Sequence, residues 1–226
     1  MSNFLARLDQ IIKERHLLNH PFYQAWNEGK LSREALTEYS KEYYKQVHAF
    51  PTYVSATHAS CDDIPIRQML LENLVEEEEG ADNHPELWLR FAESLGASKE
   101  EVRNHNALPK TKQSVRILKQ LAQSENTEVG MAALYAYESQ IPEVSTTKID
   151  GLKKFYGIDD ERSLSFFSVH EEADVIHSAM TRDAMVKLCN TPEKEARALE
   201  AAEEAADALN LLLDGVVEAH CSDMAA

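Results

Sequence analysis

Apolar residues recur along this chain at intervals of three and four positions rather than alternating with polar ones. That spacing places apolar side chains on one face of an α-helix, whereas a half-buried strand has a period of two. The helix-favouring residues alanine, leucine, glutamate and lysine dominate the same segments. The pattern predicts no strand and ten helices, at residues 3–16, 20–28, 32–60, 64–79, 85–96, 98–105, 110–124, 127–156, 161–189 and 192–214.

Residues that favour helix termini stand at the ends of these segments. Ser98 followed by Glu101 matches a capping box. Thr191 before Pro192 matches an N-cap with proline at the first helical position. Glycine favours the left-handed conformation at a helix end, and five glycines lie near segment ends: Gly29, Gly80, Gly96, Gly157 and Gly215.

Two prolines, Pro51 and Pro142, lie inside long predicted helices, and we expect each to kink or split its helix. With 43% hydrophobic residues in 226, the chain can bury one sizeable core. Only seven glycines and seven prolines are present, and no Ser/Gly-rich linker interrupts the sequence. The sequence therefore predicts an all-α, single-domain bundle over residues 1–215, with a frayed tail at 216–226.

The net charge of −16 argues against binding to nucleic acid or to anionic membranes. Three cysteines without CxxC spacing, Cys61, Cys189 and Cys221, argue against a disulfide framework and for a reducing compartment. Charges interrupt the N-terminal segment too often for a signal peptide, and no apolar stretch is long enough for a transmembrane helix. We expect a cytoplasmic protein.

The segment "SVHEEADVIHSAM", residues 168–180, carries two histidines and an aspartate on one predicted helical face. His170, Asp174 and His177 are offset by four and seven positions, which aligns them along a helix. We expect this face to be buried, because three apolar residues neighbour it: Val169, Ala173 and Ile176. An unpaired buried carboxylate is unfavourable. The stripe is therefore either a metal site or a set of inert, hydrogen-bonded core residues.

Further ligand-type residues occur on other predicted helices. Glu138 shares a stripe with apolar residues in "ALYAYESQIP", which indicates burial beside a donor or a metal. The apolar stripe of 66, 70 and 74 continues into Glu77 or Glu78, and periodicity does not choose between them. A run of glutamates is more often a solvated helix end. His84 precedes a proline at a helix start, with its ring free to turn inward.

These regions together supply three imidazoles and three carboxylates. Six mixed nitrogen and oxygen ligands are more than one catalytic zinc ion binds, and they suit two ions of iron or manganese. The paired Glu-x-x-His motifs of ferritin-like di-iron proteins do not occur in this sequence. A dimetal site here would therefore belong to another helical scaffold.

Nearly the whole chain resembles the CADD-like proteins, which were first linked to death-domain binding. The shared stretches are "HPFYQAW", "AFPTYVSATHASCDD", "NHPELW", "ALYAYESQIP" and "HEEADVIH". The resemblance implies a heme-oxygenase-like fold, related to the thiaminase (TenA) and pyrroloquinoline-quinone synthase (PqqC) branches. It favours Glu77 over Glu78 and implies that the two metals, di-iron or iron with manganese, are bound by Glu77, His84, Glu138, His170, Asp174 and His177.

The resemblance also implies a reaction, the oxygen-dependent synthesis of para-aminobenzoate for folate. The aromatic ring would come from a tyrosine of the protein itself, at the position of Tyr23, and each chain would be consumed. Tyr39 and Tyr137 would lie near the metals, and Lys148 would supply the amino group. By pattern alone Tyr23 is a core aromatic residue and Lys148 an ordinary surface lysine. Dioxygen and an external reductant would be required, and we expect a homodimer.

Three other functions are compatible with such a chain. A thiaminase-type enzyme requires a nucleophilic cysteine in its pocket, and no cysteine lies beside Glu138 or the His170 stripe in the sequence. A heme-oxygenase-like oxidase could act on a free small molecule, as quinone synthases do. A helical interaction protein would leave six inward-facing ligand residues unexplained. We therefore predict a dimetal oxygenase.

Overall fold

The computed structural model describes residues 2–221, apart from the side chains of residues 2, 172 and 173. These residues form eleven α-helices and no strand, with a short 3-10 helix at Leu17–Asn19 and a π-helical turn at Leu152–Tyr156. The α-helices are α1 (Ser2–Glu14), α2 (Pro21–Asn27), α3 (Arg33–Ser60), α4 (Ile64–Glu78), α5 (His84–Ser94), α6 (Lys99–Asn104), α7 (Pro109–Ala122), α8 (Thr127–Glu138), α9 (Ile141–Gly151), α10 (Glu161–Leu188) and α11 (Pro192–His220).

The helix ends form largely as the sequence predicts. Ser98 and Glu101 make a complete capping box at α6, and the Thr191 side chain accepts a hydrogen bond from a backbone amide in the first turn of α11. Four of the five glycines expected at helix ends have positive φ: Gly29, Gly80, Gly96 and Gly157. The expectations for Ser98, Thr191 and these four glycines are confirmed.

The two internal prolines act differently. The predicted helix over 127–156 is split, because α8 ends at Glu138 and α9 begins at Ile141, with Pro142 in its first turn. A proline has no N–H to continue the hydrogen bonds of the preceding helix, but it is tolerated in a first turn. Pro51, in contrast, lies buried inside α3, which continues without a break from Arg33 to Ser60.

The expected end of the last helix is wrong. α11 continues through Gly215 to His220, and Val216 is fully buried, so residues 216–220 are not a frayed tail. A Cβ atom at Gly215 would lie 3.0 Å from the Cβ of Lys110 at the start of α7. Gly215 therefore permits close approach of two helices rather than ending one. Residues 222–226 lie outside the described part.

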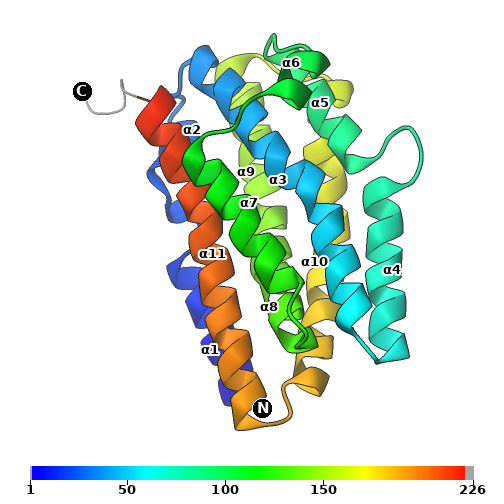
Figure 1. Ribbon diagram of the computed structural model, residues 1–226. Coiled ribbons are helices and arrows are strands. Elements are labelled where there is room, and N and C mark those ends of the chain that lie inside the picture. The colour runs from blue at the N-terminus through cyan, green and yellow to red at the C-terminus, as the bar shows by residue number, and fades with distance from the viewer. Residues whose placement is uncertain (1, 222–226) are drawn as a thin grey trace.

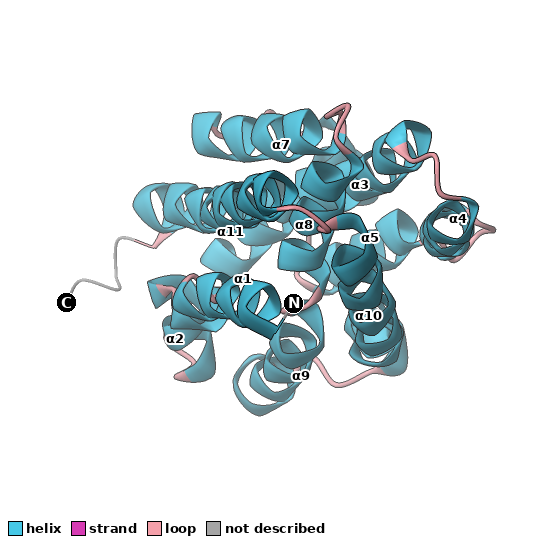
Figure 2. Ribbon diagram, turned by 90° about the horizontal axis from the view of Figure 1, so that it is seen from below, coloured by secondary structure: helices cyan, strands magenta, loops and turns pink. Residues whose placement is uncertain are grey.

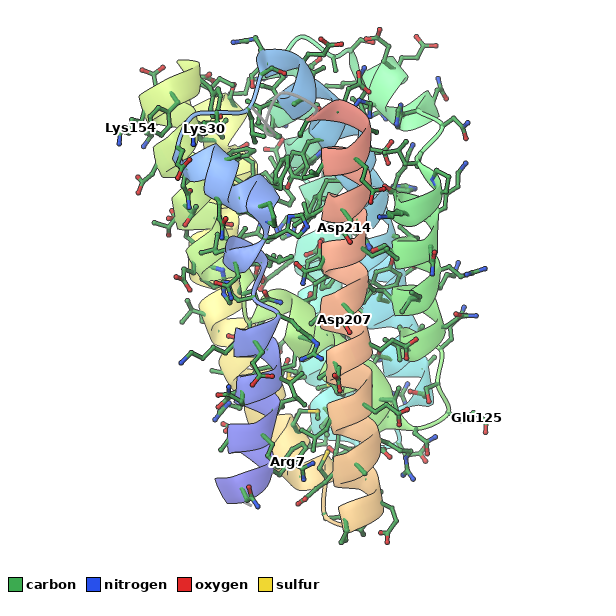
Figure 3. The ribbon with its side chains drawn as sticks, turned by 90° about the vertical axis from the view of Figure 1, so that its left-hand side faces the viewer. Arg7, Lys30, Glu125, Lys154, Asp207 and Asp214 are labelled. Atoms are coloured by element: carbon green, nitrogen blue, oxygen red, sulfur yellow. The ribbon has the colours of Figure 1, made fainter. Side chains whose placement is uncertain are left out.

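The helices form a single bundle in which α10 packs against α5, α8 and α9, and α11 packs against α7 and α8 (Figure 1). α4 lies at the periphery, beside α3, and also contacts α5 and α10 (Figure 2). Charged side chains cover the outer faces of α1 and α11, where Figure 3 labels Arg7, Asp207 and Asp214. No helix among residues 2–221 combines the length and apolar character needed to cross a membrane.

Candidate metal centre

Two clusters of ligand-type side chains lie between α4, α5, α8 and α10. The first consists of Glu77, His84 and His170, and in each cluster one ligand atom per residue lies within 4.8 Å of the others. Glu77 is near the end of α4, His84 is the first residue of α5, and His170 faces them from α10. The Glu77 Oε1 atom is 2.8 Å from Nδ1 of His84 and 4.0 Å from Nε2 of His170.

The second cluster consists of Glu138, Asp174 and His177. Glu138 is the last residue of α8, and the other two lie one turn apart on α10. His177 Nδ1 is 3.5 Å from the Asp174 carboxylate and 3.9 Å from the Glu138 carboxylate. The structure therefore brings together all six residues that the sequence suggested as ligands, as two adjacent triads.

The polar atoms of these triads are incompletely paired, which fits bound cations. His84 Nδ1 is close to Glu77, yet it makes no hydrogen bond of acceptable geometry. The Glu138 Oε2 atom is also buried without a hydrogen-bond partner among the described residues. Buried polar atoms are normally satisfied, and a metal ion in each triad would satisfy these. The donor set of imidazoles and carboxylates suits iron or manganese.

Neighbouring groups fix two of the candidate ligands in orientation. His170 Nδ1 donates to the backbone carbonyl of Phe166 at 2.5 Å, so Nε2 keeps its lone pair toward the first triad. Asn73 Nδ2 donates to Glu138 Oε1 at 2.6 Å, which leaves the other carboxylate oxygen free. Such second contacts typically hold metal ligands in the orientation that binding requires.

The carboxylates of the two triads are electrostatically crowded. Burial raises the pKa of both Glu138 and Asp174, and a neighbouring carboxylate adds to each effect: Asp174 for Glu138, and Glu77 for Asp174. Burial lowers the pKa of His170 to about 3, so this imidazole is neutral and able to coordinate. Burial also acts to lower the pKa of His177, but its hydrogen bond to Asp174 and the charge of Glu138 raise it to about 9. Cations placed in the triads would relieve this crowding.

A small cavity of about 20 Å³ adjoins both triads. Its wall includes Glu77, Glu138, His170 and Asp174, together with apolar and aromatic side chains from α3, α8 and α10. A single water requires about 10–15 Å³ on this measure. The cavity therefore has room for a molecule the size of dioxygen, and it is too small for a free aromatic substrate.

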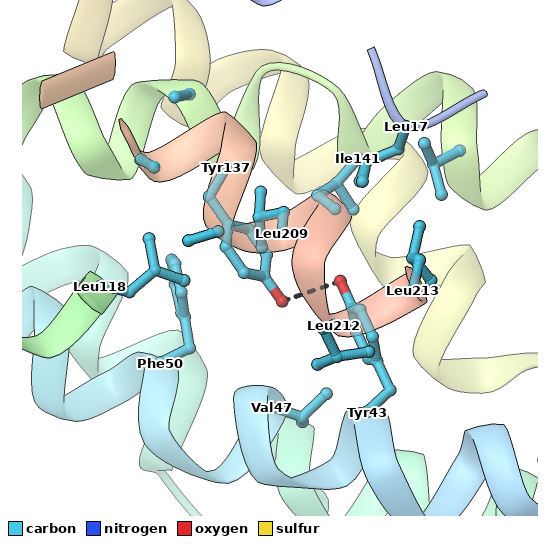
Figure 4. Close-up of a cluster of buried hydrophobic side chains, with 14 of the residues drawn as sticks. Leu17, Tyr43, Val47, Phe50, Leu118, Tyr137, Ile141, Leu209, Leu212 and Leu213 are labelled. Carbon is cyan, nitrogen blue, oxygen red and sulfur yellow. Dashed lines mark hydrogen bonds between the residues drawn. The ribbon is translucent and has the colours of Figure 1, made fainter. Parts of the chain in front are cut away.

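Two tyrosines form part of the cavity wall. The hydroxyls of Tyr43 on α3 and Tyr137 on α8 are hydrogen-bonded at 2.9 Å (Figure 4). Tyr39 and Tyr23 lie behind Tyr43: the rings of Tyr39 and Tyr43 are 5.4 Å apart, and the hydroxyls of Tyr23 and Tyr39 are 3.2 Å apart. Tyr23 is fully buried. The tyrosines implied by the resemblance thus form one connected group, in which Tyr43 stands between the cavity and Tyr39.

Lys148 also lines the cavity, although its sequence pattern alone suggested the surface. It is only 2% exposed, and its Nζ lies 4.8–5.6 Å from the centroids of five aromatic rings. No carboxylate among the described residues forms an ion pair with this amine, and burial alone shifts its pKa. Burial lowers the pKa of Lys148 to about 7, so a large fraction of the amine is neutral near neutral pH.

The structure adds residues that the sequence did not suggest. It also corrects the reason given for the burial of the stripe on α10. Tyr43 and Asn73 were missed, although Asn73 lies on the buried stripe of α4 four positions before Glu77, which was a readable signal. The stripe on α10 is buried, but not because of its neighbours. Val169 and Ile176 are 38% and 61% exposed, so the packing of α4, α5 and α8 covers the stripe instead. The Ala173 side chain lies outside the described part.

The choice between Glu77 and Glu78 is directly testable. Glu77 is buried in the first triad, whereas Glu78 is exposed. We expect Glu77→Gln to lower the metal content after anaerobic loading with iron, because a neutral amide cannot compensate the charge of a cation. Glu78→Gln should load normally. Elemental analysis of both variants measures this, and equal losses or the reverse order would show that the wrong glutamate is assigned.

The buried lysine predicts a pH-dependent stability. The pKa of Lys148 falls from 10.5 in the unfolded chain to about 7 in the fold. Between these pH values the unfolded chain holds a proton that the folded chain has lost, so stability rises with pH across this window. We expect Lys148→Met to be more stable than the unsubstituted protein at pH 7, with the difference shrinking toward pH 10. Urea unfolding of the metal-free proteins measures it. Lys153→Met, at an exposed position, is the control. If the difference in stability between Lys148→Met and the unsubstituted protein does not change with pH, the lowered pKa of Lys148 is contradicted.

Comparison with known proteins identifies relatives over nearly the whole chain. A family model described as iron-containing redox enzyme matches residues 37–210. The 4-aminobenzoate synthase of Nitrosomonas europaea is 45% identical, over 99% of this chain and 94% of the relative. That of Chlamydia pneumoniae is 42% identical, over 92% of each.

Solved structures share the fold at low sequence identity. A TenA homologue from Pseudomonas syringae superposes with a TM-score of 0.82 at 18% identity, over 96% of this chain and 92% of that one. A CADD-like protein of unknown function from Nostoc punctiforme gives a TM-score of 0.80 at 18% identity, over 98% of each chain. The predicted fold class is therefore confirmed.

Proposed function

This chain belongs to the iron-containing redox enzyme family, and we propose that it makes 4-aminobenzoate in an oxygen-dependent reaction that consumes a tyrosine of its own chain. The chain's similarity to the 4-aminobenzoate synthases of Nitrosomonas and Chlamydia supports the product. The two triads support a centre of two metal ions, with iron alone or iron and manganese.

The observation that carries the internal-substrate proposal is the size of the cavity. A cavity of about 20 Å³ is too small for a free aromatic molecule. Tyrosine rings already line this cavity or pack directly behind the residues that line it. Tyrosine carries a carbon substituent para to its hydroxyl, as 4-aminobenzoate carries a carboxyl para to its amine. The Cα–Cβ bond of the tyrosine would break, and dioxygen would oxidise Cβ to the carboxyl carbon. The phenolic oxygen would leave as water while a C–N bond forms in its place, and the Cε–Nζ bond of the donor lysine would break.

The metal ions, when bound by the six ligands, would supply the activation of dioxygen. The protein's own side chains would perform the remaining tasks. Tyr23 would provide the ring, and its hydrogen bond to Tyr39 offers a path for the phenolic proton. Tyr43 and Tyr137 would connect the cavity to these two residues.

Lys148 is the proposed source of nitrogen. Its cage of aromatic rings includes Tyr23 at 5.6 Å, Tyr39 at 5.5 Å and Tyr43 at 4.8 Å from Nζ. A protonated amine has no lone pair to donate. Because burial brings the pKa of Lys148 to about 7, the nucleophilic form is available at neutral pH without a separate base.

The proposal also includes an external reductant, a homodimer and a cytoplasmic location. The reductant follows from oxygen chemistry at reduced metal ions. All three cysteines are buried and unpaired, which is typical of a reducing compartment. The homodimer remains a prediction that light scattering of the purified protein can test.

The test is a product assay on the purified chain. The metal-free protein is loaded anaerobically with iron, or with iron and manganese, and then receives reductant and oxygen. We expect 4-aminobenzoate, detected by mass spectrometry, in an amount that does not exceed one per chain. No product from a fully loaded protein contradicts the proposed activity, and many turnovers per chain contradict the internal substrate. Elemental analysis of the most active preparation decides between iron alone and iron with manganese.

A further inference from the structure

A second opening, separate from the cavity, leads from the surface to the second triad. It is a cleft of about 60 Å³ between α4 and α10. Glu72 and Glu76 line its outer part, and both are exposed. The lining includes no lysine or arginine, so within the described residues the cleft is negatively charged.

The inner end of the cleft reaches one residue of the candidate metal centre. His177 lines it with one edge of its ring: Nε2 is 3.2 Å from Glu76 Oε2, while Nδ1 faces Asp174 and Glu138. The imidazole therefore stands between the cleft and the two carboxylates of the second triad, with one nitrogen on each side.

Asn73 lies beside His177 at the same inner end. It is only 5% exposed, and its Nδ2 donates to Glu138. Its Oδ1 is buried and has no hydrogen-bond partner among the described residues. An amide oxygen is a ligand type that hard cations accept, so a passing metal ion would satisfy an atom that the protein leaves unpaired.

We propose that this cleft is the entry route for divalent metal ions, with Glu72 and Glu76 capturing the ion at the surface and Asn73 and His177 receiving it. The inference rests on the proposed dimetal function. Carboxylates at the mouth of a cleft raise the local concentration of cations and the rate of their association. From Glu76 the ion would move past the His177 ring, whose inner nitrogen already faces the Glu138 and Asp174 carboxylates.

The proposal predicts slow loading with an unchanged final occupancy. Metal-free full-length protein is mixed anaerobically with Fe²⁺, samples are quenched with a chelator at intervals, and the iron retained per chain is counted. We expect Glu72→Gln to load about three- to tenfold more slowly at low salt and to reach the same final iron content. The double variant Glu72→Gln/Glu76→Gln should load more slowly still. High salt should reduce the difference from the unsubstituted protein, because it screens exposed charges.

Matched variants distinguish this cleft from a general effect of charge and from a second entry point. Glu204→Gln on α11 changes the net charge equally, far from the cleft, and should load normally. Glu78→Gln tests the opposite side of α4, where a separate cleft touches Glu77. Slow loading in Glu78→Gln with normal loading in Glu72→Gln would overturn the proposal in favour of that cleft.

Two further outcomes also overturn it. If Glu76→Gln lowers the final iron content while Glu72→Gln loads normally, Glu76 only orients His177. If all variants load at the unsubstituted rate, the cleft is not a route. In contrast, an unsubstituted protein that retains no iron at equilibrium contradicts the proposed dimetal function itself, so the two failures are distinguishable.

Discussion

The Tyr23→Phe variant is expected to fold normally and to form no 4-aminobenzoate. Tyr23 is fully buried, with its ring packed against Phe22 at 5.4 Å and Trp26 at 6.3 Å. Phenylalanine keeps these contacts and removes only the hydroxyl, which is hydrogen-bonded to Tyr39 at 3.2 Å. Losing that bond costs about 1 kcal/mol of folding free energy. The phenol O–H, from which oxidation of the ring would begin, is absent.

A second buried tyrosine provides the matched control for this variant. Tyr53 is also buried, and its hydroxyl donates to Gln46 at 2.9 Å, away from the cavity. Tyr53→Phe should lose a similar small amount of stability and retain full product formation. The amount of 4-aminobenzoate per chain, measured after metal loading and oxygen exposure, compares the two. Normal product from Tyr23→Phe would mean that this residue only packs in the core.

The second large effect concerns the metals. We expect His170→Ala and Asp174→Ala each to weaken metal binding by more than about tenfold while the chain stays helical. His170→Ala removes a ligand from the first triad only, and Asp174→Ala from the second only. Each variant should therefore lose one of two metals preferentially, because the three ligands of the other triad remain.

Elemental analysis after anaerobic loading and desalting measures this loss, and circular dichroism checks the fold. His48→Ala is a suitable control, because this histidine is exposed and stacks only on Tyr44. It should retain full metal content. Full occupancy of both sites in His170→Ala and Asp174→Ala would contradict the ligand assignment.

Local sequence signals predicted the helices and suggested the candidate ligands, with Glu77 and Glu78 left undecided. The offsets of four and seven among His170, Asp174 and His177 hold within one helix, so they are legible without tertiary structure. The pairing of these residues with Glu77 and Glu138 depends on how α4 and α8 pack against α10. A local pattern does not contain the register of one helix against another, nor the distance between them. Only the resemblance separated Glu77 from Glu78.

The environment of Lys148 shows most clearly what local sequence does not contain. Nothing near it in the sequence distinguishes it from a surface lysine. It is buried because α2, α3, α5 and α10 each place aromatic rings around one point, from Tyr23 to Phe167. Gly215 illustrates the same limit, because its role is set by the approach of Lys110 from another helix. Such features arise from contacts between residues far apart in sequence.

The most direct test of the internal-substrate proposal follows the tyrosine ring itself. The protein is produced with ring-labelled ¹³C tyrosine, loaded with metal, and given reductant and oxygen in unlabelled buffer. We predict that the 4-aminobenzoate carries the labelled ring, does not exceed one molecule per chain, and is accompanied by loss of mass at the peptide that contains Tyr23. Unlabelled product, or repeated turnover by a chain of unchanged mass, would contradict the account.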